Sequence, residues 1–316
     1  MTAAPALAGR PGGVPSGRRR LSLVARRRVD LWLFLLPAIA FFAVLFAYPL
    51  GYGVYLATHD VNAGSFISGR SDFVGFDNLA AVLQSPLLGI ALVNTVVITV
   101  VVVVLQLVIG LALALLFTRT FPGSRWMPLL ILIPWLLPSV VVATIWKWLM
   151  SGDGPINSLL AAVGLPTDAW LANPNTALGV VIGVAIWSGL PYWSTILGAA
   201  LLQVPAEHLE AAQLDGAGPW QRLVHIIIPS ILPVISVLVI MGVVYTLLIV
   251  DLVLVLTGGG PANSTLTVGI LTYRAAFVEF KFGLAGAYGL VLLLLSLTFA
   301  VVYVWVSRRQ ERREEA

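Results

Sequence analysis

The segment from residue 205 to 229 carries the densest set of polar and turn-forming residues between two long apolar runs. Pro205 suits the first position of a helix, and the residues up to Leu214 are good helix formers. Gly216 follows as a left-handed helix terminator, and Pro219 can start a second helix. The spacing therefore predicts a helix, a fixed turn and a second helix. The chemistry open to this segment is noncovalent contact.

One face of the first predicted helix carries Leu209, Ala212 and Gln213, and Glu207 and Glu210 add polar groups beside it. A loop that only joins two spans can be much shorter. The pattern indicates a surface that receives a partner protein. A solvated helix face is the simpler alternative for Glu210.

A stripe of polar and small residues runs along an apolar segment further upstream. Thr95, Thr99, Gln106 and Gly110 fall within about 60° of one another if each residue advances a helix by about 100°. Such a stripe faces protein rather than lipid. It either lines a substrate path or packs helices together.

Aromatic residues surround Pro191 in another apolar run, where Trp187, Tyr192 and Trp193 lie close along the chain. Pro191 cannot donate a hydrogen bond to the Trp187 carbonyl, so we expect the helix to kink or open near the middle of the membrane. Aromatic faces and freed polar groups would suit a sugar ring. Lipid-facing aromatics around a proline kink are the alternative.

Tyr245 and Asp251, in the next apolar run, are further candidates for the path. Asp251 is the one ionisable residue away from the predicted ends of the runs, whereas ion-coupled carriers usually keep several. The sequence has no phosphate-binding Gly-x-x-x-x-Gly-Lys-Ser/Thr loop and no cysteine, and its 3 histidines are scattered. We therefore predict no catalytic residue and no metal site.

Long apolar runs must position all of these residues. Of the 316 residues, 59% are hydrophobic and only 10% are charged, against about 25% charged in an average soluble domain. Six runs are long enough to cross a bilayer, which predicts an all-α, polytopic membrane protein with six transmembrane helices. The runs cover residues 31–57, 89–117, 127–149, 177–201, 226–256 and 284–306.

The distribution of Lys and Arg sets the predicted orientation. All but four of the 18 lie on one side, and the exceptions are Arg70, Lys147, Arg274 and Lys281. We therefore expect a cytoplasmic Arg-rich tail (1–29), a membrane domain (30–307) and a cytoplasmic C-terminal tail (308–316). The arginines suit an anionic membrane lipid surface, so no nucleic acid is expected as a partner.

The polar loop resembles the signature loop of binding-protein-dependent ABC importer permeases. The matching residues, at the family's spacing, are Glu210-Ala211-Ala212, Gly216 and Ile226-x-Ile228-Pro229. Asp215-Gly216-Ala217 also fits, whereas Ile228 stands where the family usually has Leu.

The resemblance extends from about residue 31 over most of the chain. Segments 73–79, 134–138 and 256–261 are similar to the carbohydrate-uptake branch. This resemblance implies the type I ABC importer permease fold in a bacterial or archaeal inner membrane. It also implies a second homologous permease, two ATPase subunits or a homodimer, and an extracytoplasmic sugar-binding protein. ATP and Mg would be bound by the ATPase, so no cofactor is expected on this chain.

By the same resemblance, residues 203–229 form a coupling loop that docks in a cleft of the ATPase. The residues assigned to coupling are Glu210, Ala211, Ala212, Asp215, Gly216 and Ala217.

No basic residue is evident within the spans, which favours a neutral sugar over a polyol phosphate such as glycerol 3-phosphate, the alternative substrate. A stand-alone secondary carrier and a membrane enzyme are alternatives from other classes. A stand-alone carrier would be expected to have more charged residues within the membrane, and a membrane enzyme would be expected to have clustered acidic residues.

Overall fold

The computed structural model describes residues 34–119, 122–124 and 126–314, and this part consists of helices joined by turns and loops. The predicted tail 1–29 lies outside the described residues, as do residues 315 and 316. The chain forms two compact units, residues 1–52 and 53–316. The predicted all-α class is confirmed.

The first unit is described from Phe34 onward as one helix with a π-helical turn, η1 (Ala43–Ala47), that leads into α2 (Tyr48–Thr58). The described part of the first unit, residues 34–52, has exposed side chains on every face of this helix. An apolar helix without a polar face suits a hydrocarbon surrounding, because lipid takes the place of a protein core.

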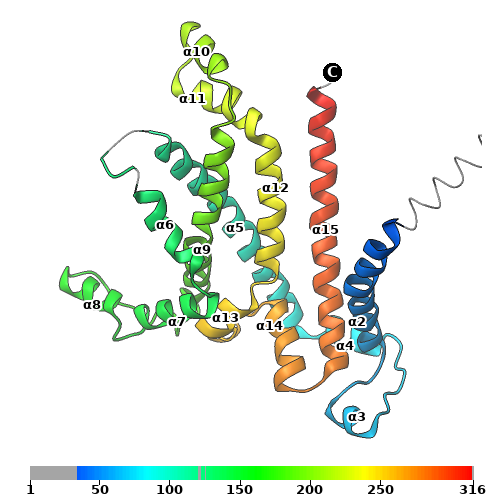
Figure 1. Cartoon of the computed structure of the whole chain (residues 1–316). Helices are drawn as coiled ribbons and strands as arrows, with labels where there is room; N and C mark the ends of the chain where they lie inside the picture. Colours follow the sequence, from blue (N-terminus) through cyan, green and yellow to red (C-terminus); the bar gives the residue numbers. More distant parts are fainter. Residues whose placement is uncertain (1–33, 120–121, 125, 315–316) are drawn as a thin grey trace, which may run out of the picture. The chain divides into compact units, whose positions relative to one another are not determined.

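The second unit is built on three helices, drawn in Figure 1 as teal, green and yellow ribbons. α5 (Pro86–Phe117) and α9 (Ala177–Leu201) form its most extensive helix pair, and α12 (Ile228–Leu247) packs on both.

Trp193 of α9 lies where these three helices meet and is 2% exposed. A Cβ added to Gly110 of α5 would lie 2.9 Å from the Trp193 Cβ, and one added to Gly242 of α12 would lie 2.6 Å from its ring. The two glycines therefore let the helices approach closely around the indole, as small residues do in membrane proteins.

The last helix, α15 (Phe282–Glu314), packs against three short elements of the second unit. These are α4 (Asp77–Gln84), α14 (Val268–Tyr273) and the π-helical turn η3 (Arg274–Val278). A further short helix, α3 (Ala63–Ser68), starts with an Asn62 capping box.

The predicted span 127–149 is broken rather than straight. It consists of α6 (Met127–Leu136) and α7 (Ser139–Leu149), which are bent by 101°. Leu137 precedes a proline and has ψ of 138°, because the proline ring disfavours a helical conformation at that position.

The predicted span 226–256 is also wrong at both ends. The helix starts earlier, with α11 (Pro219–Arg222) and the π-helical turn η2 (Leu223–Ile227), and continues through α12 to Leu247. It breaks at Leu248–Ile249, and α13 (Val250–Leu256) is a separate helix. Five helices of the described part are long and apolar enough to cross a membrane, and the α6–α7 pair makes a sixth if it is counted as one span.

The prediction at Pro191 was a kink or an opening of the helix; α9 remains helical through Pro191, so the opening is not observed. The Ser194 and Thr195 hydroxyls donate to the Pro191 carbonyl at 3.1 and 2.7 Å. Packing against α5 holds the backbone in place, and contact with a neighbouring helix is one way in which membrane helices tolerate proline.

Candidate functional site

The α10–α11 arm, residues 205–222, has the predicted helix, turn and helix. α10 (Ala206–Leu214) begins after Pro205, which is its N-cap, and α11 begins at Pro219. Gly216 between them has φ of +80°, the left-handed region. The structure thus confirms both proline positions to within one residue and the role of glycine in the turn.

Backbone hydrogen bonds close this turn. The Ala217 N–H donates to the Ala212 carbonyl at 2.8 Å, and the Gly216 N–H donates to the Gln213 carbonyl at 3.1 Å. This pair of bonds is the Schellman ending of an α-helix. The Gly218 N–H donates to the Gln221 side-chain oxygen at 2.8 Å, which caps the start of α11. The turn is therefore fixed on both sides.

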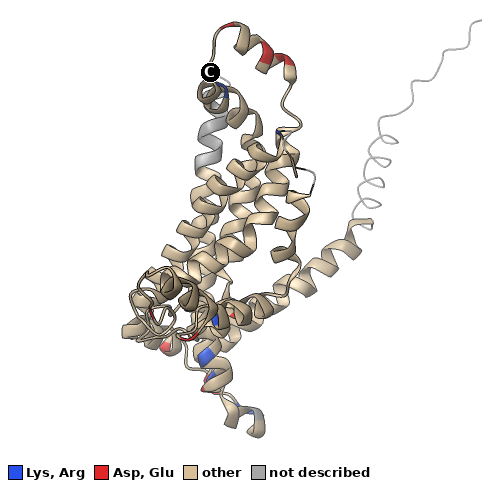
Figure 2. Cartoon of the chain, turned by 90° about the vertical axis from the view of Figure 1, so that its left-hand side faces the viewer, with Lys and Arg blue, Asp and Glu red and all other residues tan. Residues whose placement is uncertain are grey.

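The arm exposes both acidic and apolar side chains. Figure 2 shows acidic residues gathered on α10, and Glu210, Ala211 and Asp215 are exposed. Leu214 and Trp220 are 89% and 73% exposed, and neither is among the residues predicted for coupling. Large apolar residues within a polar loop were the signal that could have found them.

A hollow of about 350 Å³ lies beside the turn of the arm. Its walls come from the turn and from the first part of the long helix that follows. The lining residues are Asp215, Gly216, Ala217, Gln221, His225 and Ile226.

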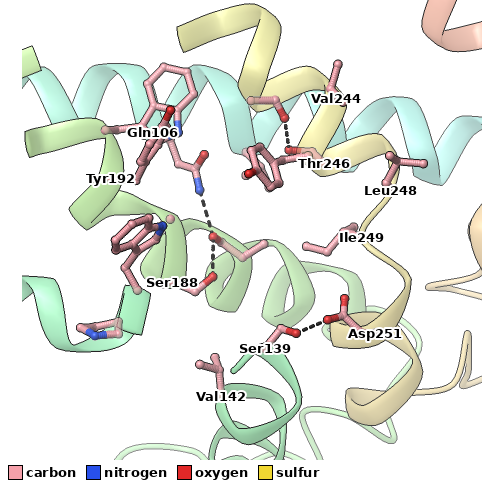
Figure 3. A pocket seen from close by; sticks show the side chains of 18 of the residues that line it. Gln106, Ser139, Val142, Ser188, Tyr192, Val244, Thr246, Leu248, Ile249 and Asp251 are labelled. Atoms are coloured by element: carbon pink, nitrogen blue, oxygen red, sulfur yellow. Dashed lines mark hydrogen bonds between the residues drawn. The ribbon is translucent and has the colours of Figure 1, made fainter. Parts of the chain in front are cut away.

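A larger cavity of about 560 Å³ lies among α5, α6, α7, α9, α12 and the stretch 248–251 (Figure 3). Five of the eight residues predicted for a substrate path line it together. These are Gln106, Tyr192, Trp193, Tyr245 and Asp251. Trp135 of α6 also lines it and stacks on Tyr192, with 5.9 Å between ring centroids and 22° between planes.

Polar contacts in this cavity converge on one carbonyl. The Gln106 amide nitrogen donates to the Ala185 carbonyl at 3.0 Å, and the Ser188 hydroxyl donates to the same oxygen at 3.1 Å (Figure 3). The Thr246 hydroxyl donates to the Gly242 carbonyl at 2.6 Å. Ser188 and Thr246 were missed in the sequence, because a single hydroxyl in an apolar run does not distinguish a cavity from helix packing.

Asp251 lies in the first turn of α13, next to the break in the helix, and not within a continuous span. Its carboxylate accepts a hydrogen bond from the hydroxyl of Ser139, the first residue of α7 (Figure 3). Lys147, at the other end of α7, donates to the Val255 carbonyl of α13 at 3.0 Å. Two polar contacts thus connect α7 to α13.

The other three predicted path residues lie outside this cavity. The Thr95 hydroxyl donates to the Ala91 carbonyl at 2.6 Å and accepts from the Val268 N–H at 3.1 Å. Thr99 is fully buried, and Trp187 packs edge-to-face against Trp146. In this structure all three contribute to helix packing, and their part in a path stays a prediction.

The glycine-rich loop after α13 is held by side chains from two helices. The Asn94 amide of α5 donates to the carbonyls of Asn263, Ser264 and Leu266 at 3.4, 3.1 and 3.0 Å. Arg274 donates to the Gly258 carbonyl at 2.6 Å. Among the residues that the structure describes, no three His, Cys, Asp or Glu side chains cluster as metal ligands would.

Comparisons with known proteins agree with this architecture. A family model described as the inner membrane component of binding-protein-dependent transport systems matches residues 106–312. A probable ABC transporter permease protein of Brucella suis is 32% identical over 284 residues, which cover 89% of this chain and 97% of the relative. The trehalose transport system permease protein SugA of Mycobacterium tuberculosis is also 32% identical over 284 residues, 90% of each chain.

Among solved structures, a bacterial ABC transporter involved in the import of the acidic polysaccharide alginate has the same fold. It aligns with a TM-score of 0.76 and 23% identity, over 92% of this chain and 99% of the other.

Proposed function

Because the chain belongs to the family of inner membrane components of binding-protein-dependent transport systems, we propose that it forms half of the translocation path of an ATP-driven carbohydrate importer. The relative from Mycobacterium tuberculosis is named for trehalose, and this name supports a saccharide as the substrate class.

One observation supports ATP coupling above the others. The helix from Pro219 to Leu247 is continuous, and at 1.5 Å per residue it is about 40 Å long. Its first end lies at the Gly216 turn, and its last two turns carry Gly242, Tyr245 and Thr246 of the cavity wall. A displacement of the α10–α11 arm would therefore reach the cavity through one helix.

In this proposal the arm docks on a cytoplasmic ATPase subunit. Glu210 and Asp215 offer exposed carboxylates, Ala211 and Ala212 allow close approach, and the Gly216–Ala217 turn sets the angle between the helices. The exposed apolar side chains of Leu214 and Trp220 would add the buried area that a stable contact needs.

A neutral saccharide suits the cavity better than a polyol phosphate. Asp251 is the only charged residue among those that line it in the described part of the chain. A phosphate or carboxylate would meet no compensating cation there and would face the carboxylate of Asp251, which is unfavourable at low dielectric.

The remaining parts of the importer follow from the family. We propose a second homologous permease, two ATPase subunits or a homodimer that bind ATP and Mg, and an extracytoplasmic sugar-binding protein. Both termini would be cytoplasmic in the cell membrane. A stand-alone carrier is not favoured, because Asp251 alone would have to provide ion coupling.

Reconstitution tests this proposal. The chain would be co-expressed with its partner permease, ATPase and binding protein, placed in liposomes, and assayed for uptake of radiolabelled trehalose, maltose and glycerol 3-phosphate. We expect sugar uptake that requires ATP and the ATPase.

A second arm of the experiment replaces Glu210 and Gly216 together, and we expect the ATPase to be lost from the purified complex. Uptake by the chain alone, or uptake that needs no ATP, would overturn the proposal.

A further inference from the structure

The Ala185 carbonyl of α9 accepts two hydrogen bonds, from the Gln106 amide and from the Ser188 hydroxyl. Both are side-chain bonds, added to the backbone bond that a carbonyl inside a continuous helix accepts from the residue four positions on. Because the acceptor is a carbonyl, the Gln106 atom that faces it must be the nitrogen. The amide oxygen of Gln106 then points elsewhere, and Figure 3 shows it turned away from Ala185.

Gly189 of α9 fixes the place of this amide. A Cβ added to Gly189 would lie 2.1 Å from the Gln106 nitrogen and 2.9 Å from its amide carbon. Real contacts are never so short, so the Gln106 amide occupies the space that any side chain at position 189 would need. Gln106 is also only 6% exposed, and its chain cannot swing freely. Its oxygen is therefore presented to the cavity in one orientation.

The aliphatic hydroxyls of the cavity all donate their protons to acceptors of the protein itself. Ser188 donates to Ala185, Thr246 donates to Gly242, and Ser139 donates to Asp251. Each hydroxyl proton is used by the protein, which leaves the oxygen lone pairs free. With the Gln106 oxygen and the Asp251 carboxylate, these lone pairs are the hydrogen-bond acceptors of the wall, to which Tyr192 and Tyr245 add phenol hydroxyls.

We propose that Gln106 is a specificity-determining residue of this cavity: held between the Ala185 carbonyl and the bare backbone of Gly189, its amide oxygen accepts a hydrogen bond from a hydroxyl of a neutral saccharide. This inference rests on the proposed import function and adds the group that selects the substrate. Acceptors in the wall favour ligands with many hydroxyl donors, and they disfavour a phosphate or carboxylate group, which brings acceptors and negative charge.

The test uses the complete importer in liposomes and the sugar that the wild-type complex imports, trehalose or maltose. KM and kcat of uptake are measured for that sugar and for its monodeoxy analogues. The wild type should discriminate against one deoxy analogue by about tenfold in kcat/KM, the worth of one hydrogen bond in a site that then leaves a polar group unpaired. Gln106→Met, of similar length but without the amide, should raise KM for the parent sugar and lose that discrimination.

Gly189→Ala provides the positioning test and Gly183→Ala its matched control. Both glycines lie in α9, but a Cβ at Gly183 meets nothing within 4 Å. Gly189→Ala should raise KM about tenfold, whereas Gly183→Ala should leave KM unchanged. Combining Gly189→Ala with Gln106→Ser removes the clash, so thermal unfolding of the double variant shows whether a loss in the single variant is only misfolding.

Each result has a defined meaning. If the wild type imports no sugar, the proposed function fails and the inference with it. If it imports glycerol 3-phosphate instead, an importer is retained but the neutral-saccharide inference is overturned. If it imports sugar and the Gln106 and Gly189 variants keep the wild-type KM and the wild-type preference among deoxy analogues, the inference is wrong while the proposed function stands.

Discussion

Replacement of Gly216 is the sharpest test of the α10–α11 arm. Its φ of +80° lies in the left-handed region, and a Cβ added there meets nothing within 4 Å. The penalty for Gly216→Ala is therefore conformational alone, about 1–2 kcal/mol. This corresponds to a population of the native turn that is about 5–30-fold lower relative to other conformations.

If the ATPase binds only the native turn, its apparent Kd should rise as the fraction of chains with that turn falls, by at most the same factor. The chain contains no cysteine, so one cysteine introduced outside the arm allows a fluorophore to be attached for a titration with purified ATPase. Gly216→Asn should weaken binding less than Gly216→Ala, because asparagine enters the left-handed region more readily.

Gly218→Ala is the matched control, since Gly218 has φ of −68° and the nearest atom to an added Cβ lies 3.7 Å away. It should bind the ATPase as the wild type does. If Gly216→Ala and Gly218→Ala weaken binding equally, or if neither does, the turn does not set the contact and the reasoning is refuted.

Three further predictions concern packing and charge. Asn94→Asp should lower the thermal unfolding midpoint more than Asn94→Leu does. The reason is that a buried carboxylate would face the three carbonyls to which the Asn94 amide now donates. Equal midpoints of the two variants would contradict this. Gly242→Ala should cost about 1–3 kcal/mol of stability through its contact with the Trp193 ring, and Trp193→Phe should restore part of it, as chemical unfolding would show. A cysteine placed at Ser188 should react faster with a cationic than with an anionic methanethiosulfonate. Asp251→Asn should reduce the ratio of the cationic to the anionic reaction rate. If that ratio is unchanged, Asp251 does not set the charge preference.

The arm could be predicted from the sequence because its geometry is local. Two prolines and one glycine at fixed spacing determine where each helix begins and ends, and no distant contact is needed. The apolar runs were equally clear, since the hydropathy of a segment does not depend on how it packs.

The breaks in the helices could not be predicted in the same way. Pro138 marks the bend between α6 and α7, yet Pro191 and Pro233 lie inside continuous helices, and no proline lies at Leu248–Ile249. Tertiary packing decides which proline interrupts a helix, so the sequence alone treats the three alike.

The candidate cavity could be predicted only in part, because tertiary packing also decides which residues line it. Gln106 was found because its helical stripe also contains Thr95 and Thr99, but only its place in the lining of the cavity separates it from those two packing residues. Asp251 was placed within a span, whereas the break at Leu248–Ile249 puts it at the start of a new helix.

Both helix breaks border the same cavity, since Leu137, Ser139, Leu248 and Ile249 line it. Backbone groups that a continuous helix would pair are tolerated at membrane depth where they line a space filled with water. Under the proposed function this cavity is hydrated before a sugar arrives, and each sugar hydroxyl exchanges a bond to water for a bond to the cavity wall as it enters. Because protein bonds replace water bonds in that exchange, the net free energy that retains a hydrophilic molecule is small, and the molecule can leave again.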